Sequence, residues 1–257
     1  MKQRRQQSTL PLLAFHSLDS HPSPISFPPE LFQRGLERLH GAGYRSITVG
    51  AAAGFLRERR PWPDGTLALS FDDGYLSVFE RGFPVLAKLG YAATVFLTAG
   101  IGHAHGLPPM QGRPRLRWDQ VRLMHKAGIE IGVHTMTHPD LTRLDESQIE
   151  AETAGSRAAI EDAIGARVTS FSYPFGFHNA LARGIVRRHF DCACSGDLGL
   201  LTPESDPYAL ERLEMHYFRN PSTFNLLSGP LLPGYIRLRG FPRHIRQRIL
   251  RSMGGRP

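Results

Sequence analysis

Short apolar segments alternate with amphipathic ones along most of this chain, and this alternation restricts the possible folds more than any other feature. Seven segments have the length and apolar character of buried strands: 10–15, 44–49, 66–71, 93–97, 129–134, 169–174 and 191–195. Five others have the spacing of apolar residues that is typical of helices: 28–39, 76–89, 118–127, 145–164 and 178–189. Strands that alternate with helices at this pitch are usually parallel and joined by crossover helices. Six to seven such units favour a closed (β/α) barrel, although an open sheet has the same pattern.

The size and charge distribution of the chain indicate a folded α/β region followed by a basic segment. With 257 residues, 41% of them hydrophobic, the chain can bury a large core in one large domain or in two small ones. The alternation stops near residue 220, so we place the folded domain at 1–220 and a tail at 221–257. Much of the net charge of +8 comes from the chain ends, and seven arginines lie between Arg237 and Arg256. Such a tail binds anionic partners, among them lipid head groups and nucleic acid, or is simply solvated.

Cysteine usage and the N-terminal segment both bear on the cellular compartment. Cys192 and Cys194 lie two residues apart in a predicted strand, on one face of it, where a disulfide has poor geometry. We therefore expect two core thiols and no disulfide framework of the secreted kind. The apolar run at 10–15 is short and contains Pro11, unlike a secretory signal, and no segment approaches the roughly 18 apolar residues of a membrane span. These features predict a cytoplasmic protein.

Three segments rich in chemically reactive residues each follow the end of a predicted strand. They are Phe-Asp-Asp-Gly-Tyr at 71–75, His-Thr-Met-Thr-His at 134–138 and Tyr-Pro-Phe-Gly at 173–176. In parallel α/β folds the carboxyl ends of the strands lie at one edge, and ligand groups gather there. The positions of these segments therefore predict a single shared site.

Adjacent carboxylates and paired histidines are suited to holding a cation and moving protons. Asp72 and Asp73 repel each other, so one favours a bound cation while the other is left for proton transfer. An Asp-Asp-Gly sequence is also common in turns and helix caps. His134 and His138 are four residues apart, and on a helical turn both imidazoles would reach one metal ion. One aspartate with two histidines leaves coordination positions open for water and substrate, as hydrolysis requires.

The third segment is expected to supply a backbone donor. Pro174 and Gly176 favour a tight turn that can direct main-chain N–H groups into the site, where they would stabilise an oxyanion. Taken alone, the same residues are equally typical of an ordinary turn between a strand and a helix.

Together the three segments resemble the motifs of the polysaccharide deacetylase family, also called the NodB-homology or carbohydrate esterase 4 group. Ser-Phe-Asp-Asp-Gly at 70–74 resembles the first motif, T/S-F-D-D-G. His-Thr-Met-Thr-His matches the second, H-S/T-x-x-H, and Ser-Tyr-Pro-Phe-Gly at 172–176 resembles the third, R-x-P-Y/F-G. The resemblance covers roughly residues 10–216, and it implies a deformed (β/α) barrel of about seven strands.

The resemblance also implies separate roles for the residues of the site. Asp73, His134 and His138 would bind a divalent metal ion, usually zinc in this family. Asp72 would be the catalytic base that takes a proton from the attacking water. The backbone N–H of Phe175 would donate to the oxyanion that forms from the acetamide carbonyl.

Other motif residues are expected to act on the substrate or on the histidine loop. Tyr75, Pro174 and Phe175 are expected to contact the substrate. Thr135 or Thr137 is expected to steady the loop between the two histidines through hydrogen bonds.

Two departures from the family pattern leave part of the site open. The arginine of the third motif, which pairs with the catalytic aspartate in relatives, is Ser172 here, and we expect Arg212 to approach Asp72 in its place. The family's L-x-H motif supplies a histidine as general acid, but the nearest match, Leu-Glu-Met-His, has one residue too many. His216 of that match and His16, at the end of the first predicted strand, are both candidates for the acid.

From these features we expect a metal-dependent hydrolase that removes the N-acetyl group from an amino sugar in a polysaccharide or glycan precursor. The alternatives are a deacylase or deformylase acting on a lipid-linked sugar or a non-sugar amide, and a non-catalytic glycan-binding module. The expected partners are an N-acetylated carbohydrate and, through the basic tail, an anionic membrane surface at its cytoplasmic face. No nucleic acid is expected, because the arginine-rich tail lacks interleaved aromatic residues.

Overall fold

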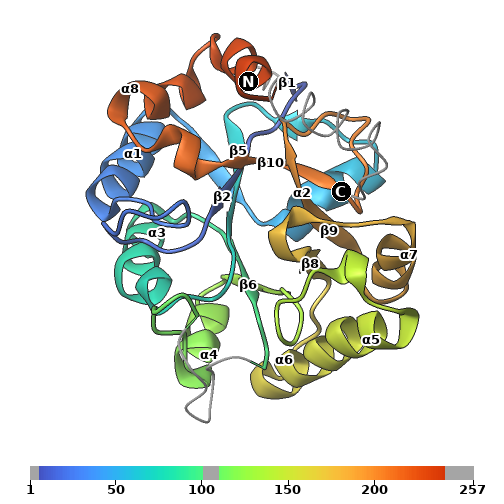
Figure 1. Ribbon diagram of the computed structural model, residues 1–257. Coiled ribbons are helices and arrows are strands. Elements are labelled where there is room, and N and C mark those ends of the chain that lie inside the picture. The colour runs from blue at the N-terminus through green and yellow to red at the C-terminus, as the bar shows by residue number, and fades with distance from the viewer. Residues whose placement is uncertain (1–5, 101–109, 241–257) are drawn as a thin grey trace.

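Seven parallel strands form a closed barrel in the computed structural model, which describes residues 6–100 and 110–240 (Figure 1). In order around the barrel they are β2 (Leu12–Phe15), β5 (Thr66–Phe71), β6 (Thr94–Leu97), β7 (Glu130–Val133), β8 (Ser170–Ser172), β9 (Cys192–Leu198) and β10 (Leu210–Glu214). The barrel closes because β2 pairs with β5 on one side and with β10 on the other. The predicted (β/α) barrel of about seven strands is confirmed.

One predicted strand is not part of the barrel wall, and one barrel strand was not predicted. The segment predicted at 44–49 forms β3 (Arg45–Ile47), which pairs only with the first half of β5, while β6 pairs with the second half. The seventh strand is instead β10, whose sequence Leu-Glu-Arg-Leu-Glu lacks the apolar character of the other strands. Its charged residue Arg212 lies inside the barrel mouth and is buried, so the usual apolar signal of an inward position is missing.

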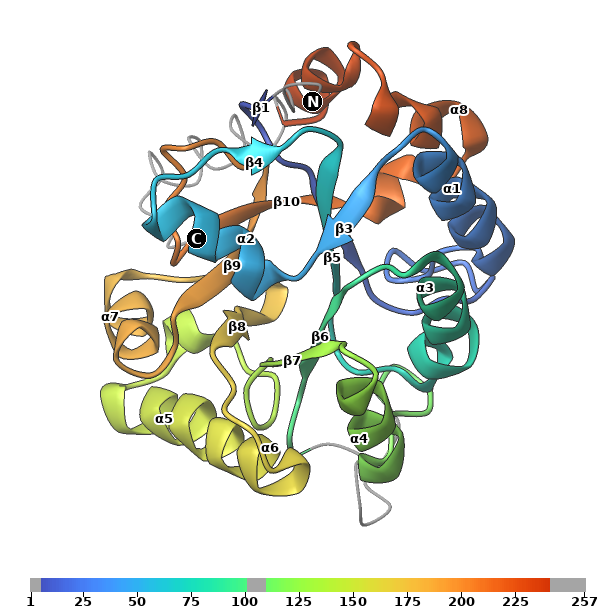
Figure 2. The same ribbon diagram turned by 180° about the vertical axis from the view of Figure 1, so that it is seen from behind.

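Helices surround the strands, as the two opposite views show (Figures 1 and 2). They are α1 (Pro29–Gly41), α2 (Val49–Arg57), α3 (Phe83–Leu89), α4 (Trp118–Lys126), α5 (Glu146–Glu150), α6 (Ser156–Ile164), α7 (Ala180–His189) and α8 (Pro221–Phe224). Two π-helical segments extend them: η1 (Val78–Gly82) precedes α3, and η3 (Ala151–Gly155) joins α5 to α6. The five predicted helices are thus confirmed, with small shifts at their ends.

Helix α2 was not predicted, and it closes the end of the barrel opposite the site. Nearly all of its residues are apolar or small, so the sequence shows little contrast between its faces. Thr48 caps its first turn by accepting a hydrogen bond from the Ala51 N–H at 3.1 Å. The Val49 N–H donates to Thr94 Oγ1 at the start of β6, at 2.8 Å. The Gly50 N–H donates to the Glu130 carboxylate at the start of β7, at 3.1 Å. Figure 2 shows α2 across this end of the barrel.

The core has an inner part within the barrel and an outer part between the barrel and its helices. The inner part joins barrel residues to the apolar face of α2 and to Trp62; it contains Leu12, Ala68, Phe96, Cys192, Cys194, Leu210, Val49 and Ala53. Both cysteines are fully buried and free, as predicted. Gly132 is required here, since a Cβ at this position would lie 2.4 Å from the Phe96 ring. The outer part is larger and includes most apolar residues of the other helices.

Short elements complete the described structure. β1 (Gln6–Gln7) pairs antiparallel with β4 (Trp62–Pro63). Single 3-10 turns occur at η2 (Leu141–Arg143), η4 (Pro174–Gly176), η5 (Met215–Phe218) and η6 (Asn225–Ser228). None of the helices within the described ranges is long and apolar enough to cross a membrane.

The first part of the basic tail packs against the barrel domain. Phe224, Leu227, Leu232 and Ile236 belong to the outer core, and residues 232–240 are helical. Residues 241–257, which carry most of the tail's arginines, lie outside the described residues.

Candidate active site

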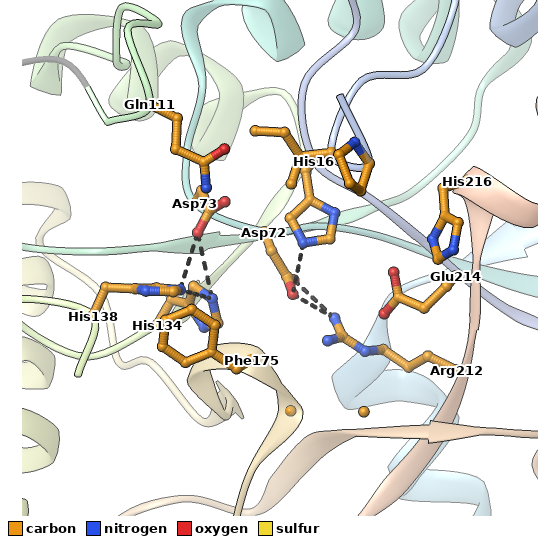
Figure 3. A pocket seen from close by; sticks show the side chains of 14 residues that line it. His16, Asp72, Asp73, Gln111, His134, His138, Phe175, Arg212, Glu214 and His216 are labelled. Carbon is orange, nitrogen blue, oxygen red and sulfur yellow. Dashed lines mark hydrogen bonds and ion pairs between the residues drawn. The ribbon is translucent and has the colours of Figure 1, made fainter. Parts of the chain in front are cut away.

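The carboxyl ends of the barrel strands bring the predicted segments together in one pocket of about 230 Å³ (Figure 3). Asp72 and Asp73 follow β5, His134 follows β7, and Phe175 follows β8. Arg212 enters from β10 and His16 from the end of β2. The single shared site predicted from the strand ends is therefore present.

Three side chains converge as metal ligands would. His134 Nε2 and His138 Nε2 lie 3.2 Å apart, and Asp73 Oδ1 lies 3.5 Å from the first and 3.4 Å from the second. A tetrahedron with bonds of about 2.0–2.1 Å, the lengths of Zn–N and Zn–O bonds, has edges of about 3.3–3.4 Å, so the triangle matches one of its faces. Asp73 Oδ1 is buried and has no hydrogen-bond partner among the described residues. Such an orphaned acceptor between two imidazoles fits a divalent cation, and the three residues form a candidate metal site.

The tautomer of His134 also suits metal binding. Its Nδ1 lies 2.7 Å from the carbonyl oxygen of Ser172. Because a carbonyl only accepts, Nδ1 must carry the proton and donate it, which leaves the lone pair on Nε2. Ser172, at the end of β8, thus orients His134, the candidate ligand that follows β7.

Burial keeps both histidines in the neutral form that a metal requires. Desolvation lowers the pKa of His134, although the charges of Asp72 and Asp73 oppose it. Desolvation and the neighbouring His134 lower the pKa of His138 to about 4. At neutral pH neither imidazole has to lose a proton before it can bind a cation.

This lowered pKa predicts that the metal-free protein loses stability as pH falls from 6.5 to about 4. In that window an unfolded histidine binds a proton and folded His138 does not, so the unfolded state takes up more protons and the free energy of unfolding decreases. His138 alone contributes as much as about 3 kcal/mol. Urea unfolding at pH 7 and pH 4.5 checks this, with His138→Asn as the matched variant because asparagine tolerates the local backbone. An equal pH dependence in both proteins would contradict the prediction.

Four residues of the three strand-end segments have left-handed backbone conformations that non-glycine residues rarely adopt. They are Asp73 (φ 70°), Thr135 (φ 67°), His138 (φ 63°) and Phe175 (φ 58°). Each such residue costs on the order of 1–3 kcal/mol and persists only where surrounding contacts hold it. The strain therefore lies in the segments that carry the candidate ligands and the turn after β8.

Asp72 is held by donors from two other strands. Arg212 Nη1 donates to both carboxylate oxygens at 2.8 Å, and the Ser172 hydroxyl donates to Oδ2 at 3.3 Å. The expected approach of Arg212 to Asp72 is confirmed, and both residues are buried. Desolvation alone would raise the pKa of Asp72, but the charge of the buried Arg212 guanidinium lowers it to about 2. The Asp72 carboxylate is consequently ionised at neutral pH.

The two candidate acids both line the pocket. His16 Nε2 lies 4.0 Å from Asp72 Oδ2. Figure 3 shows His16 next to Asp72 and His216 next to Glu214. The placement is compatible with a proton donor at either position, and the choice between them stays a prediction.

The three residues expected to contact the substrate have different positions. Phe175 lines the pocket, its side chain is 60% exposed, and its ring lies 4.7 Å from that of His138. Tyr75 is fully buried under the Arg115 guanidinium, which lies 5.2 Å from the ring centre. Pro174 is also buried and shapes the turn. Neither Tyr75 nor Pro174 is among the residues that line this pocket, and their contact with substrate stays a prediction.

Two polar residues that line the pocket, Glu214 and Gln111, were not predicted. Glu214 lies two residues after Arg212 on β10 and shares its inward face, so recognition of that strand would have identified it. Gln111 lies in a turn between Met110 and Arg113, and Figure 3 shows its side chain pointing toward Asp73. No strand or motif marks Gln111 in the sequence.

Comparisons with known proteins agree with this geometry. Residues 59–189, just over half of the chain, match the family model described as polysaccharide deacetylase. The chain is 28% identical over 217 residues to YxkH of Bacillus subtilis (strain 168), whose name places it among polysaccharide deacetylases; the match covers 84% of this chain and 74% of that protein.

Two solved structures have a similar fold. The deacetylase PplD of Streptococcus pyogenes, in complex with acetate, superposes with a TM-score of 0.73 at 20% identity, covering 80% of this chain and 91% of that one. IcaB from Ammonifex degensii superposes with a TM-score of 0.72 at 24% identity, covering 86% and 96%. At these identities the likeness establishes the barrel fold.

Proposed function

The chain belongs to the polysaccharide deacetylase family of hydrolases, and from this premise we propose that it is a metal-dependent enzyme that removes the N-acetyl group from an amino sugar. The observation that carries the proposal is the pairing of two adjacent carboxylates with different partners. Asp73 faces two neutral histidines, whereas Asp72 faces a buried arginine. One carboxylate is arranged as a ligand and the other as a base.

The proposed cofactor is a divalent ion, with zinc favoured by the set of two imidazoles and one carboxylate. Asp73, His134 and His138 would hold it. When bound, such an ion acts as a Lewis acid that polarises a carbonyl and makes water more acidic.

Asp72 takes a proton from the attacking water in this proposal. Its ionised state at neutral pH leaves it free to accept the proton, and Arg212 and Ser172 fix the direction of its oxygens. A carboxylate with a pKa of about 2 is a weak base, so it is effective only toward water that has been made more acidic. The low basicity of Asp72 thus supports dependence on a metal.

The remaining steps need an oxyanion donor and an acid. The backbone N–H of Phe175, in the turn after β8, is proposed to donate to the oxyanion of the attacked acetamide. His16 or His216 is proposed to give a proton to the departing amine, since both line the pocket. The products are acetate and a free amino sugar.

Substrate profiling tests the proposal. A panel of N-acetylated glycans and glycan precursors, the matching N-formyl sugars and simple non-sugar amides would be incubated with the metal-loaded protein. We expect equal amounts of acetate and free amine from at least one N-acetylated sugar. Release of formate alone, or cleavage of non-sugar amides alone, would favour the deformylase or deacylase alternative and contradict the proposal.

We further propose a cytoplasmic location, with an anionic membrane surface contacted through the basic tail. Leu231, just before the helical residues 232–240, and Leu238, within them, are exposed, whereas Ile236 faces the core and cannot reach lipid. A chain that ends at residue 240 keeps the packed part of the tail and lacks most of its arginines. We expect this variant to sediment less than the full chain with anionic liposomes and equally with neutral ones. Unchanged sedimentation would refute the membrane contact.

A further inference from the structure

The loop between the two candidate histidine ligands is strained at both ends. Thr135 and His138 both have left-handed backbone conformations. Within the loop, the Thr135 hydroxyl accepts a hydrogen bond from the His138 N–H at 2.9 Å, as expected for one of the two threonines. On the side of β6, the Ala99 and Gly100 N–H groups donate to the carbonyl oxygens of Thr135 and Met136 at 3.0 and 2.8 Å. These bonds leave the N–H groups of Met136 and Thr137 to be held in a loop whose two imidazole nitrogens lie 3.2 Å apart.

Glu152 supplies further contacts to the loop from a different element. Its Oε2 accepts hydrogen bonds from the backbone N–H groups of Met136 and Thr137, both at 2.8 Å. Its Oε1 accepts from the Thr137 hydroxyl at 2.6 Å. One carboxylate therefore binds the whole outer side of the loop, through charge-assisted hydrogen bonds that are stronger than neutral ones.

The local structure around Glu152 is arranged for this contact. Glu152 lies in the π-helical segment η3, which interrupts the otherwise continuous helix from α5 to α6. π-helical turns are rare and often occur at functional sites. In the part of the chain that the structure describes, Glu152 forms no ion pair, unlike Glu150, which contacts Arg188 and His189. The charge of Glu152 is thus directed at the histidine loop.

We infer that Glu152 is a positioning residue for the metal site, which holds loop 135–138 in the conformation that brings His134 and His138 together. The inference rests on the proposed metal-dependent function. Glu152 does not touch the pocket and acts only through the loop, in the way that outer partners of metal ligands act.

Glu152→Ala removes all three contacts and is expected to weaken metal binding about 10- to 100-fold, the range for loss of such outer partners. Glu152→Gln keeps the shape: its amide oxygen can accept from both N–H groups and its NH₂ can donate to the Thr137 hydroxyl. We expect this variant to retain most of the affinity. Glu150→Ala is the matched control, since it breaks ion pairs on the same helix and leaves the loop untouched.

Two measurements test the inference. The first is the Co²⁺ dissociation constant and visible absorption spectrum of each protein, which report ligand geometry independently of turnover. The second is amide hydrogen exchange at Met136 and Thr137 in the metal-free proteins, which requires no metal site. We expect Glu152→Ala to show weaker binding, an altered spectrum and faster exchange at these amides, with Glu150→Ala unchanged.

Wild-type affinity and spectrum in Glu152→Ala, or unchanged exchange at the two amides, would overturn the inference. Failure of the proposed function looks different, because the wild-type protein itself would then bind no Co²⁺. In that case the positioning role is overturned as well, even if Glu152 still orders the loop.

Discussion

Asp72→Asn is expected to lower turnover by about 10²- to 10⁴-fold, the contribution typical of a positioned general base, while metal remains bound. Asparagine has nearly the same shape and can still accept a hydrogen bond from Arg212, but it cannot accept a proton from water at neutral pH. Asp73, His134 and His138 are unchanged in this variant, so the metal site should persist. Initial rates of acetate release and metal content of the same preparation check both halves of the prediction.

A control is needed because the substitution removes the negative partner of a buried arginine. Arg212 is 3% exposed, and an unpaired buried guanidinium destabilises the fold. The double variant Asp72→Asn with Arg212→Met removes that charge and should restore stability without restoring activity. Activity within 10-fold of wild type in folded, metal-loaded Asp72→Asn would show that Asp72 is not the base, because that loss is below the range expected of a general base.

Asp73→Asn is expected to abolish stoichiometric metal binding and, with it, activity. The neutral amide oxygen replaces an anionic ligand between two neutral imidazoles, so the negative charge that compensates the cation is lost. Asparagine is preferable to alanine here because Asp73 has φ of 70°, a conformation that asparagine tolerates. Metal analysis after dialysis, together with the thermal unfolding midpoint, separates ligand loss from misfolding.

The companion variant Asp72→Asn serves as the matched control, since it alters the adjacent carboxylate and is expected to keep its metal. We therefore expect Asp72→Asn to retain metal and lose activity, and Asp73→Asn to lose both. One equivalent of metal retained by Asp73→Asn would exclude Asp73 as a required ligand.

The strand-end residues of the site could be predicted because local sequence carries their signals. Asp72 and Asp73 follow an apolar strand directly, and the four-residue spacing of His134 and His138 is visible without any tertiary information. The barrel itself follows from the alternation of strands and helices. These features depend on neighbours in the sequence, and the structure confirms them.

The rest of the site depends on contacts between distant segments. Arg212 lies 140 residues from Asp72, in a strand whose charged residues hide the period-two pattern. Family resemblance pointed to this contact, whereas Glu214 on the same strand face went unnoticed. Tyr75 belongs to a motif, yet its side chain turns into the core, because a motif position does not determine which way a side chain faces.

Acetate release before and after removal of metal tests the central proposal most directly. The protein would be stripped with a chelator, dialysed, and assayed on the N-acetylated sugar that it cleaves fastest, without metal and with one equivalent of zinc. We predict that the stripped wild-type protein releases no acetate above background and that one equivalent of zinc restores its original rate. The same addition of zinc should not raise the rate of Asp73→Asn. Acetate release at an unchanged rate from the metal-free protein would contradict the proposed mechanism.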